Sequence, residues 1–250
     1  MRRITAILAV MCGCIFFFPW PVPAADELAE ADRLFALGGL ENFQKSIPIY
    51  AKAAAQDSGS FEANWKSARA HREYANQAKR QEIADWKNIC AEHGKAGMQM
   101  AQKAIDLQPN KPDGYYYYGV NVGIYSDGVS IVTALAEGLK DQTQSSFEKA
   151  YAIDKNYRQG GPMLSLGRFW TVLPWPLHDR PKALTYFREY QKAGFFDANL
   201  EAHLFLSELL IKLGGEANQA EAKKYLEKAS QSPDSYFKIW ATRLLAEIGK

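Results

Sequence analysis

Apolar residues recur every three to four positions along most of the chain, and this pattern is clearest between residues 160 and 192. There it predicts two helices joined by a proline-rich elbow. Asp179 is placed to cap the second helix, with Pro181 in its first turn, where a missing N–H costs nothing. Gly167 of the first helix would face Phe187 of the second, a small residue opposite a large one. Such a helical hairpin cannot bury its apolar face alone, so it needs neighbours.

The same periodicity predicts further hairpins on both sides of this segment. Two of the predicted helices are unusually long, and the one at about 80–107 would extend about 40 Å at 1.5 Å per residue. The last helix has Trp240 and Leu244 inward and charged residues outward, which is typical of a terminal cap. Outside 160–192, the sequence predicts a helix that is capped by Ser46 and has Pro48 in its first turn. The other expected helices cover residues 27–38, 61–75, about 80–107, 112–124, about 129–153 and 235–248, with a further hairpin around 204–229.

Alanines recur at one position of the second helices, which is the packing pattern of a tetratricopeptide repeat (TPR). They are Ala53, Ala104, Ala150 and Ala229, with Tyr190 in the corresponding place of the fourth hairpin. The intervals exceed the about 34 residues of a regular TPR, so the repeats are degenerate and lengthened. No alternating strand pattern of useful length occurs. We expect an all-α, TPR-like helical-hairpin superhelix over residues 25–250, with two lengthened helices and a C-terminal capping helix.

The first 24 residues have the pattern of a secretory signal peptide. Arg2 and Arg3 precede an apolar run over 4–20, and Val22 and Ala24 fit the small-residue rule for cleavage after Ala24, or one residue later. This predicts export to the periplasm and no transmembrane span after cleavage.

Two alternatives to a cleaved signal peptide stay open. An uncleaved membrane anchor is disfavoured by Pro19, Pro21 and Pro23, because a spanning helix needs about 20 apolar residues. Lipoprotein anchoring at Cys14 is disfavoured by Met11, which stands where leucine is usual. Cleavage leaves one cysteine, so no intramolecular disulfide is possible.

Composition indicates a packed, charge-neutral protein. Apolar residues make up 47% of the chain, enough for a sizeable core. Without Arg2 and Arg3, 28 basic and 28 acidic residues remain. Nucleic-acid binding through a basic face is therefore not expected.

Catalytic and metal-binding motifs are missing from the sequence. No nucleophile elbow, zinc-protease motif or phosphate-binding loop occurs. Cys90 and His93 have no second ligand pair, whereas zinc sites usually have about four ligands. We expect a packed thiol and a core imidazole, and we expect no enzyme activity, no metal and no cofactor.

Two aromatic groups are candidates for binding. Four tyrosines over 115–118 point all the way round a helix, so they cannot all be core. If Tyr115 and Tyr118 pack on the partner helix, the other two face a groove, a neighbouring repeat or water. Arg168 directly follows Gly167, so its side chain should turn toward the concave face. Trp175 in the proline-rich elbow could form one wall of a cleft. The candidate groove residues are Tyr116, Tyr117, Asn121, Tyr125, Arg168, Trp170 and Trp175.

The alternative is that the tyrosines fill wide gaps between degenerate repeats. In that case Arg168 would pair with a nearby carboxylate, and none of these residues would mark a binding site.

Several of these segments also match one bacterial family. YYYYGVNVGIYSDG, a helix ending in FEKAYAIDKNY, and GGPMLSLGRFW followed by PWPL and PKALTYF resemble the T component of TRAP transporters over about residues 60–250, best at 114–190. The same elements are similar to the TPR-like regulators of microtubule dynamics. The first resemblance implies a periplasmic helical protein that docks a solute-binding protein, with self-association and an internal pore or cleft for an apolar ligand as further expectations. The T component proper is a lipoprotein, whereas the lipoprotein signal here is weak.

The leading hypothesis is a non-enzymatic periplasmic scaffold that binds a protein partner, as an accessory to TRAP-type solute uptake. The partner would be a periplasmic solute-binding protein, and homo-oligomers are also expected from the resemblance. The alternative is a carrier of a small apolar ligand, held in an aromatic cleft between hairpins.

Overall fold

The computed structural model describes residues 24–248. The predicted signal peptide and the lipoprotein alternative at Cys14 lie outside the described residues. Within the described part of the chain all regular structure is helical, which confirms the all-α prediction.

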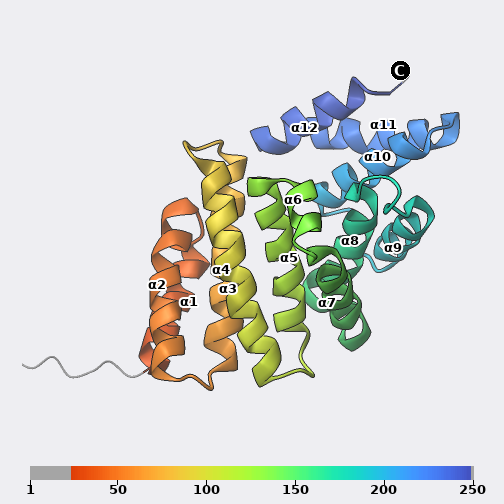
Figure 1. Cartoon of the computed structure of the whole chain (residues 1–250). Helices are drawn as coiled ribbons and strands as arrows, with labels where there is room; N and C mark the ends of the chain where they lie inside the picture. Colours follow the sequence, from red (N-terminus) through yellow and green to blue (C-terminus); the bar gives the residue numbers. More distant parts are fainter. Residues whose placement is uncertain (1–23, 249–250) are drawn as a thin grey trace, which may run out of the picture.

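Twelve helices span the described residues, arranged as successive antiparallel hairpins with a final single helix (Figure 1). They are α1 (Ala24–Leu37), α2 (Leu40–Gln56), α3 (Phe61–Arg80), α4 (Trp86–Leu107), α5 (Pro112–Val129), α6 (Ile131–Ala136), α7 (Leu139–Ile153), α8 (Tyr157–Val172), α9 (Arg180–Lys192), α10 (Leu200–Leu213), α11 (Glu216–Ser230) and α12 (Ser235–Leu245).

The first helices of consecutive hairpins form the inner layer of a superhelix. Helix α3 contacts α5, α5 contacts α8, α8 contacts α10, and α10 contacts α12. The second helices α4, α7, α9 and α11 pack outside their own hairpin partners. Figure 1 shows helices α1 to α5 side by side, with α7 to α9 beyond α5 and α10 to α12 at the upper right.

Glycines opposite large side chains set the close approach of the helices, as the sequence predicts for 160–192. A Cβ at Gly167 would lie 2.9 Å from the ring of Phe187. A Cβ at Gly119 would lie 2.4 Å from the ring of Phe147 in the same way. Asp179 caps α9 as predicted, and its side chain accepts a hydrogen bond from the Lys182 N–H at 2.9 Å.

The start of α2 was placed wrongly at Ser46. The helix begins six residues earlier, after Gly39, which has φ 82°. Ser46 is fully buried within the helix, and its hydroxyl donates to the Phe43 carbonyl at 2.8 Å. Pro48 also lies inside α2, so neither residue marks the helix start.

The expected helix at 80–107 is interrupted at its beginning. Helix α3 continues to Arg80, and Glu82 and Asp85 adopt positive φ angles of 50° and 64°. The long helix α4 therefore starts at Trp86 and has 22 residues, which is about 33 Å.

The expected helix at 129–153 is divided. Helix α5 runs through Asp127-Gly128 to Val129, and Gly138, with φ 74°, separates α6 from α7. Val132 lies in the short helix α6 and is 66% exposed. Leu37, the last residue of α1, is also exposed.

The tyrosine run also differs in register from the prediction. Tyr117 and Tyr118 are buried, whereas Tyr115 and Tyr116 are half-buried. Tyr117, not Tyr115, packs in the core because its ring stacks on Trp65 of α3, with centroids 5.8 Å apart.

The last helix reaches back to α3, the first helix of the second hairpin. Arg80 of α3 forms an ion pair with Asp234, the N-cap residue of α12. Its guanidinium carbon also lies 4.8 Å from the ring centroids of Tyr236 and Phe237. The inner layer from α3 to α12 is thus closed by side-chain contacts between its two ends.

Candidate functional site

The inner layer encloses a cavity of about 360 Å³, here called the concave cavity. It is lined from α3, α5, α6, α7, α8, α10 and α12. Because residues from almost every inner helix converge on it, the cavity exists only in the assembled superhelix.

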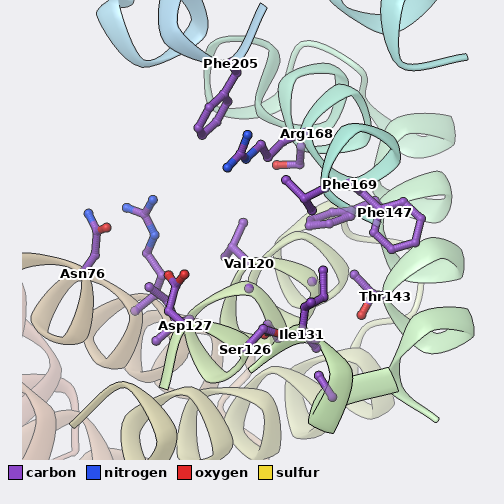
Figure 2. A pocket seen from close by; sticks show the side chains of 18 of the residues that line it. Asn76, Val120, Ser126, Asp127, Ile131, Thr143, Phe147, Arg168, Phe169 and Phe205 are labelled. Atoms are coloured by element: carbon purple, nitrogen blue, oxygen red, sulfur yellow. Dashed lines mark hydrogen bonds between the residues drawn. The ribbon is translucent and has the colours of Figure 1, made fainter. Parts of the chain in front are cut away.

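The walls of the concave cavity are mainly apolar. Figure 2 shows Val120 in the middle, with Phe147 and Phe169 on one side. Phe205 of α10 and Trp240 of α12 complete the wall. This surface fits an apolar group that enters from solvent.

Polar side chains lie around these walls and are mostly paired with one another. Figure 2 shows Arg168 beside Phe205, across the cavity from Asn76 and Asp127. Arg168 Nη1 donates to Glu208 Oε2 at 2.6 Å, and its guanidinium lies 4.6 Å from the ring centroid of Phe205.

Glu208 remains charged despite its surroundings. Burial alone would raise the pKa of this carboxyl, but Arg168 and Lys212 together hold it below its usual value. Arg168 therefore turns toward the concave face as predicted and also has the carboxylate partner that the alternative predicts. Its positive charge is largely neutralised within the chain.

Tyr116 lies between the concave cavity and a second cavity. Its ring packs edge-on against Tyr117 and Tyr157, with centroids 5.2 and 5.5 Å apart. A Cβ at Gly161 would lie 2.8 Å from the Tyr116 ring, so the glycine leaves room for this side chain. Burial raises the pKa of Tyr116, which keeps its hydroxyl protonated.

The second cavity has a volume of about 450 Å³ and lies between the α1–α2 corner, α3, α5 and the start of α8. It is here called the arginine–aromatic cavity, after the three arginines and four aromatic residues that line it. These are Arg69, Arg72, Arg158, Phe35, Phe43, Tyr116 and Tyr117.

Asn121 and Tyr125 hold helices together and do not line either cavity. Asn121 is fully buried, and its Nδ2 donates to the Ala68 carbonyl of α3 at 3.1 Å. Tyr125 packs over Gly94 of α4, and its hydroxyl donates to Glu137 at 2.9 Å.

The two tryptophans predicted to line a groove, Trp170 and Trp175, do not line the concave cavity. Trp170 is buried in the core between α8 and α9, with the Lys182 ammonium 4.2 Å from its ring centroid. Trp175 is 83% exposed in the α8–α9 connection. Of the seven predicted residues, the structure brings Tyr116 and Arg168 to the concave cavity, and Tyr116 and Tyr117 to the arginine–aromatic cavity.

Sequence reasoning missed Phe205 and Trp240 in the concave cavity, and Phe35 and Arg158 in the second one. Trp240 was placed inward on a capping helix, but nothing in the sequence indicates that this helix meets α3. Arg158 lies two residues before Gly160-Gly161-Pro162, and this helix-breaking sequence is the one signal that could have pointed to it.

The histidines and the cysteine of the described chain occupy packed positions. His71 and His93 share a hydrogen bond between their Nδ1 atoms at 2.9 Å, and burial lowers the pKa of both. Cys90 is fully buried, and burial raises its pKa to about 11. Within 24–248, no three His, Cys, Asp or Glu side chains gather closely enough to hold a metal ion.

Among the helices of the described chain, none combines the length and apolar character that crossing a membrane requires.

No protein-family model matches this chain, and no curated protein matches it. Its structure is similar to the crystal structure of a thermophilic TPR protein from Thermus thermophilus. The TM-score is 0.61 at 17% sequence identity, and the match covers 89% of this chain and 99% of that chain. This similarity supports the fold: the chain is a TPR-like helical-hairpin superhelix, an architecture whose concave surface commonly binds protein partners.

Proposed function

We propose that this protein is a non-enzymatic, exported scaffold that binds a protein partner through its concave cavity. The proposal extends to a role as an accessory of TRAP-type solute uptake, with a periplasmic solute-binding protein as partner. The observation that supports partner binding is the apolar cavity on the inner face of a TPR-like superhelix. The uptake role depends on the sequence resemblance at residues 114–190.

The size of the cavity determines how the partner would bind. A volume of about 360 Å³ holds a few side chains and not a folded domain. The partner would therefore insert an exposed apolar segment among Val120, Phe169 and Phe205. Such buried apolar anchors supply most of the binding energy in protein interfaces, while the polar rim around them excludes water.

Gly123 allows a selective test, because it lines the concave cavity and a Cβ there meets nothing within 4 Å. Gly123→Phe should fill the cavity without displacing the backbone. The matched control is Ala220→Phe, which puts the same ring on an exposed position of α11.

In the experiment, a tagged chain of residues 25–250 captures partners from a periplasmic extract. The purified partner is then titrated against the parent chain and the two variants. A solute-binding protein that binds the parent chain and Ala220→Phe, but binds Gly123→Phe at least about tenfold more weakly, would support the proposal. Equal binding to all three chains would rule out the concave cavity as the site.

A small apolar ligand is the second candidate occupant. The contact of α12 with α3 favours it, because Tyr236 and Trp240 shield the cavity on the side of α12. Native mass spectrometry after gentle purification should then find a lipid-sized mass on the parent chain and none on Gly123→Phe. Unmodified mass in the parent chain, together with a captured protein, would favour the scaffold.

A further inference from the structure

We propose that the arginine–aromatic cavity binds a monoanionic ligand, a carboxylate attached to an apolar body, with Arg158 as its charge partner. This cavity lies on the other side of Tyr116 from the concave cavity. The proposal is independent of the partner-binding function proposed above.

The charges around the cavity leave one arginine without a carboxylate partner. Arg69 lies 3.6 Å from Asp32, and Arg72 lies 2.7 Å from Glu73. Within residues 24–248, no carboxylate forms an ion pair with Arg158. Its contacts are with aromatic rings and with the Tyr157 hydroxyl, which itself donates to Asp113 at 2.6 Å. One unpaired positive charge matches a ligand with one negative charge.

The backbone places the Arg158 side chain in an unusual way. Arg158 and Gln159 have φ angles of 50° and 55°, and Gly160 follows with φ 78°. Left-handed conformations are unfavourable for non-glycine residues and are concentrated at functional sites. Here two in succession bring the guanidinium to 5.6 Å from the ring centroid of Trp65 and 5.8 Å from that of Tyr117.

Aromatic faces hold the guanidinium without using its N–H donors for ion pairing. Arg158 is an exposed residue, so solvent and ligands can reach these donors. A planar guanidinium presents parallel N–H groups that match the two oxygens of a carboxylate. The stacked rings thus orient an anion-binding group toward the cavity.

The remaining walls favour an apolar body over a hydrophilic one. Phe35 and Phe43 come from α1 and α2, with ring centroids 5.0 Å apart, and Val120 of α5 also lines the cavity. A dianionic phosphate would need a second unpaired cation, and Arg69 and Arg72 are already paired. An aryl or alkyl carboxylate satisfies both the single charge and the apolar wall.

Isothermal titration of the chain from residue 25 to 250 with 3-phenylpropionate, octanoate and indole-3-acetate tests the proposal. The neutral amide of each compound is the ligand control. Arg158→Gln removes the charge partner, and Arg243→Gln removes an exposed arginine on α12 as the protein control. Gly123→Phe reports whether the probes use the concave cavity instead.

At least one of the acids should bind the parent chain, with its amide and Arg158→Gln each weaker by about tenfold or more. Arg243→Gln and Gly123→Phe should leave that affinity unchanged, and a circular dichroism melt should show that Arg158→Gln is folded. No binding of any acid up to about 5 mM, or equal binding by Arg158→Gln, would overturn the proposal. Loss of binding in Gly123→Phe alone would place the probes in the concave cavity and would also overturn it.

Discussion

Arg80 and Asp234 form an ion pair although 154 residues separate them in the sequence. Arg80 ends α3, and Asp234 begins α12, where its carboxylate also accepts the Tyr236 N–H at 2.9 Å. The pair fixes the terminal helix against the first inner helix of the closed layer. Tyr236 and Trp240 reach the concave cavity only because α12 lies there.

Arg80→Gln should loosen α12 while leaving most of the fold intact. The variant loses one partly exposed ion pair and two ring contacts, together about 1–2 kcal/mol. Hydrogen exchange followed by mass spectrometry should show faster exchange in α12 and unchanged exchange in α4. Arg243→Gln on α12 is the control, and equal protection of α12 in Arg80→Gln would refute the closure.

Gly167→Ala should destabilise the protein, because the new Cβ would lie 2.9 Å from the Phe187 ring. Overpacking of a buried contact typically costs about 1–3 kcal/mol. Gly123→Ala is a matched control within an inner helix, where the Cβ meets open space. This control should raise the free energy of unfolding by about 0.5–1 kcal/mol, since alanine has a higher helix propensity than glycine. Urea unfolding of the two variants should give shifts of opposite sign.

Gly97 and Asn121 should show strong energetic coupling. A Cβ at Gly97 would lie 2.1 Å from Asn121 Oδ1, so Gly97→Ala alone should cost about 1–3 kcal/mol. In the Asn121→Ala background the obstructing amide is gone, and the same change should cost much less. A double-mutant cycle by urea unfolding measures the difference, and additive effects would contradict this packing.

Stability should fall as the pH drops from about 6.5 to about 4. Burial lowers the pKa of His71 and of His203 to about 4, with His93 adding to the effect at the former and Lys228 at the latter. Both are neutral in the folded chain, whereas the unfolded chain binds protons from about pH 6.5 downward. Each histidine should therefore lower the free energy of unfolding by roughly 1–2 kcal/mol between pH 7 and pH 5.

His203→Phe removes one of the two imidazoles that take up a proton on unfolding at low pH. Unfolding in urea at pH 7.5 and at pH 5.0 should show a smaller acid loss in this variant than in the parent chain. An unchanged difference between the two pH values would mean that His203 does not titrate as its burial implies.

The hairpins were predictable because small and large residues alternate locally. Gly167 and Phe187 lie within one segment, and so do Asp179 and the helix that it caps. The boundaries were harder to predict where the chain leaves the helix without glycine or proline. Glu82 and Asp85 adopt positive φ although neither is glycine, and Ser46 resembles a cap but lies buried in mid-helix.

The candidate site was only partly predictable because it depends on how the hairpins curve. The positions of Arg168 and Tyr116 could be predicted, because each depends only on which face of its own helix the residue occupies. Trp175 was judged by its residue type, and the geometry of the elbow leaves it exposed. Phe205 and Trp240 join the cavity through contacts between distant hairpins, which helical periodicity does not describe.

The contact between α3 and α12 changes how the repeats share their stability. In an open array each repeat depends only on its neighbours, so the terminal unit can fray without affecting the others. Here the last helix also rests on an early one, and fraying at the C-terminal end removes support from both sides of the concave cavity. The inner helices from α3 to α12 are therefore expected to support one another around a closed path, and not only along a linear series of neighbouring units.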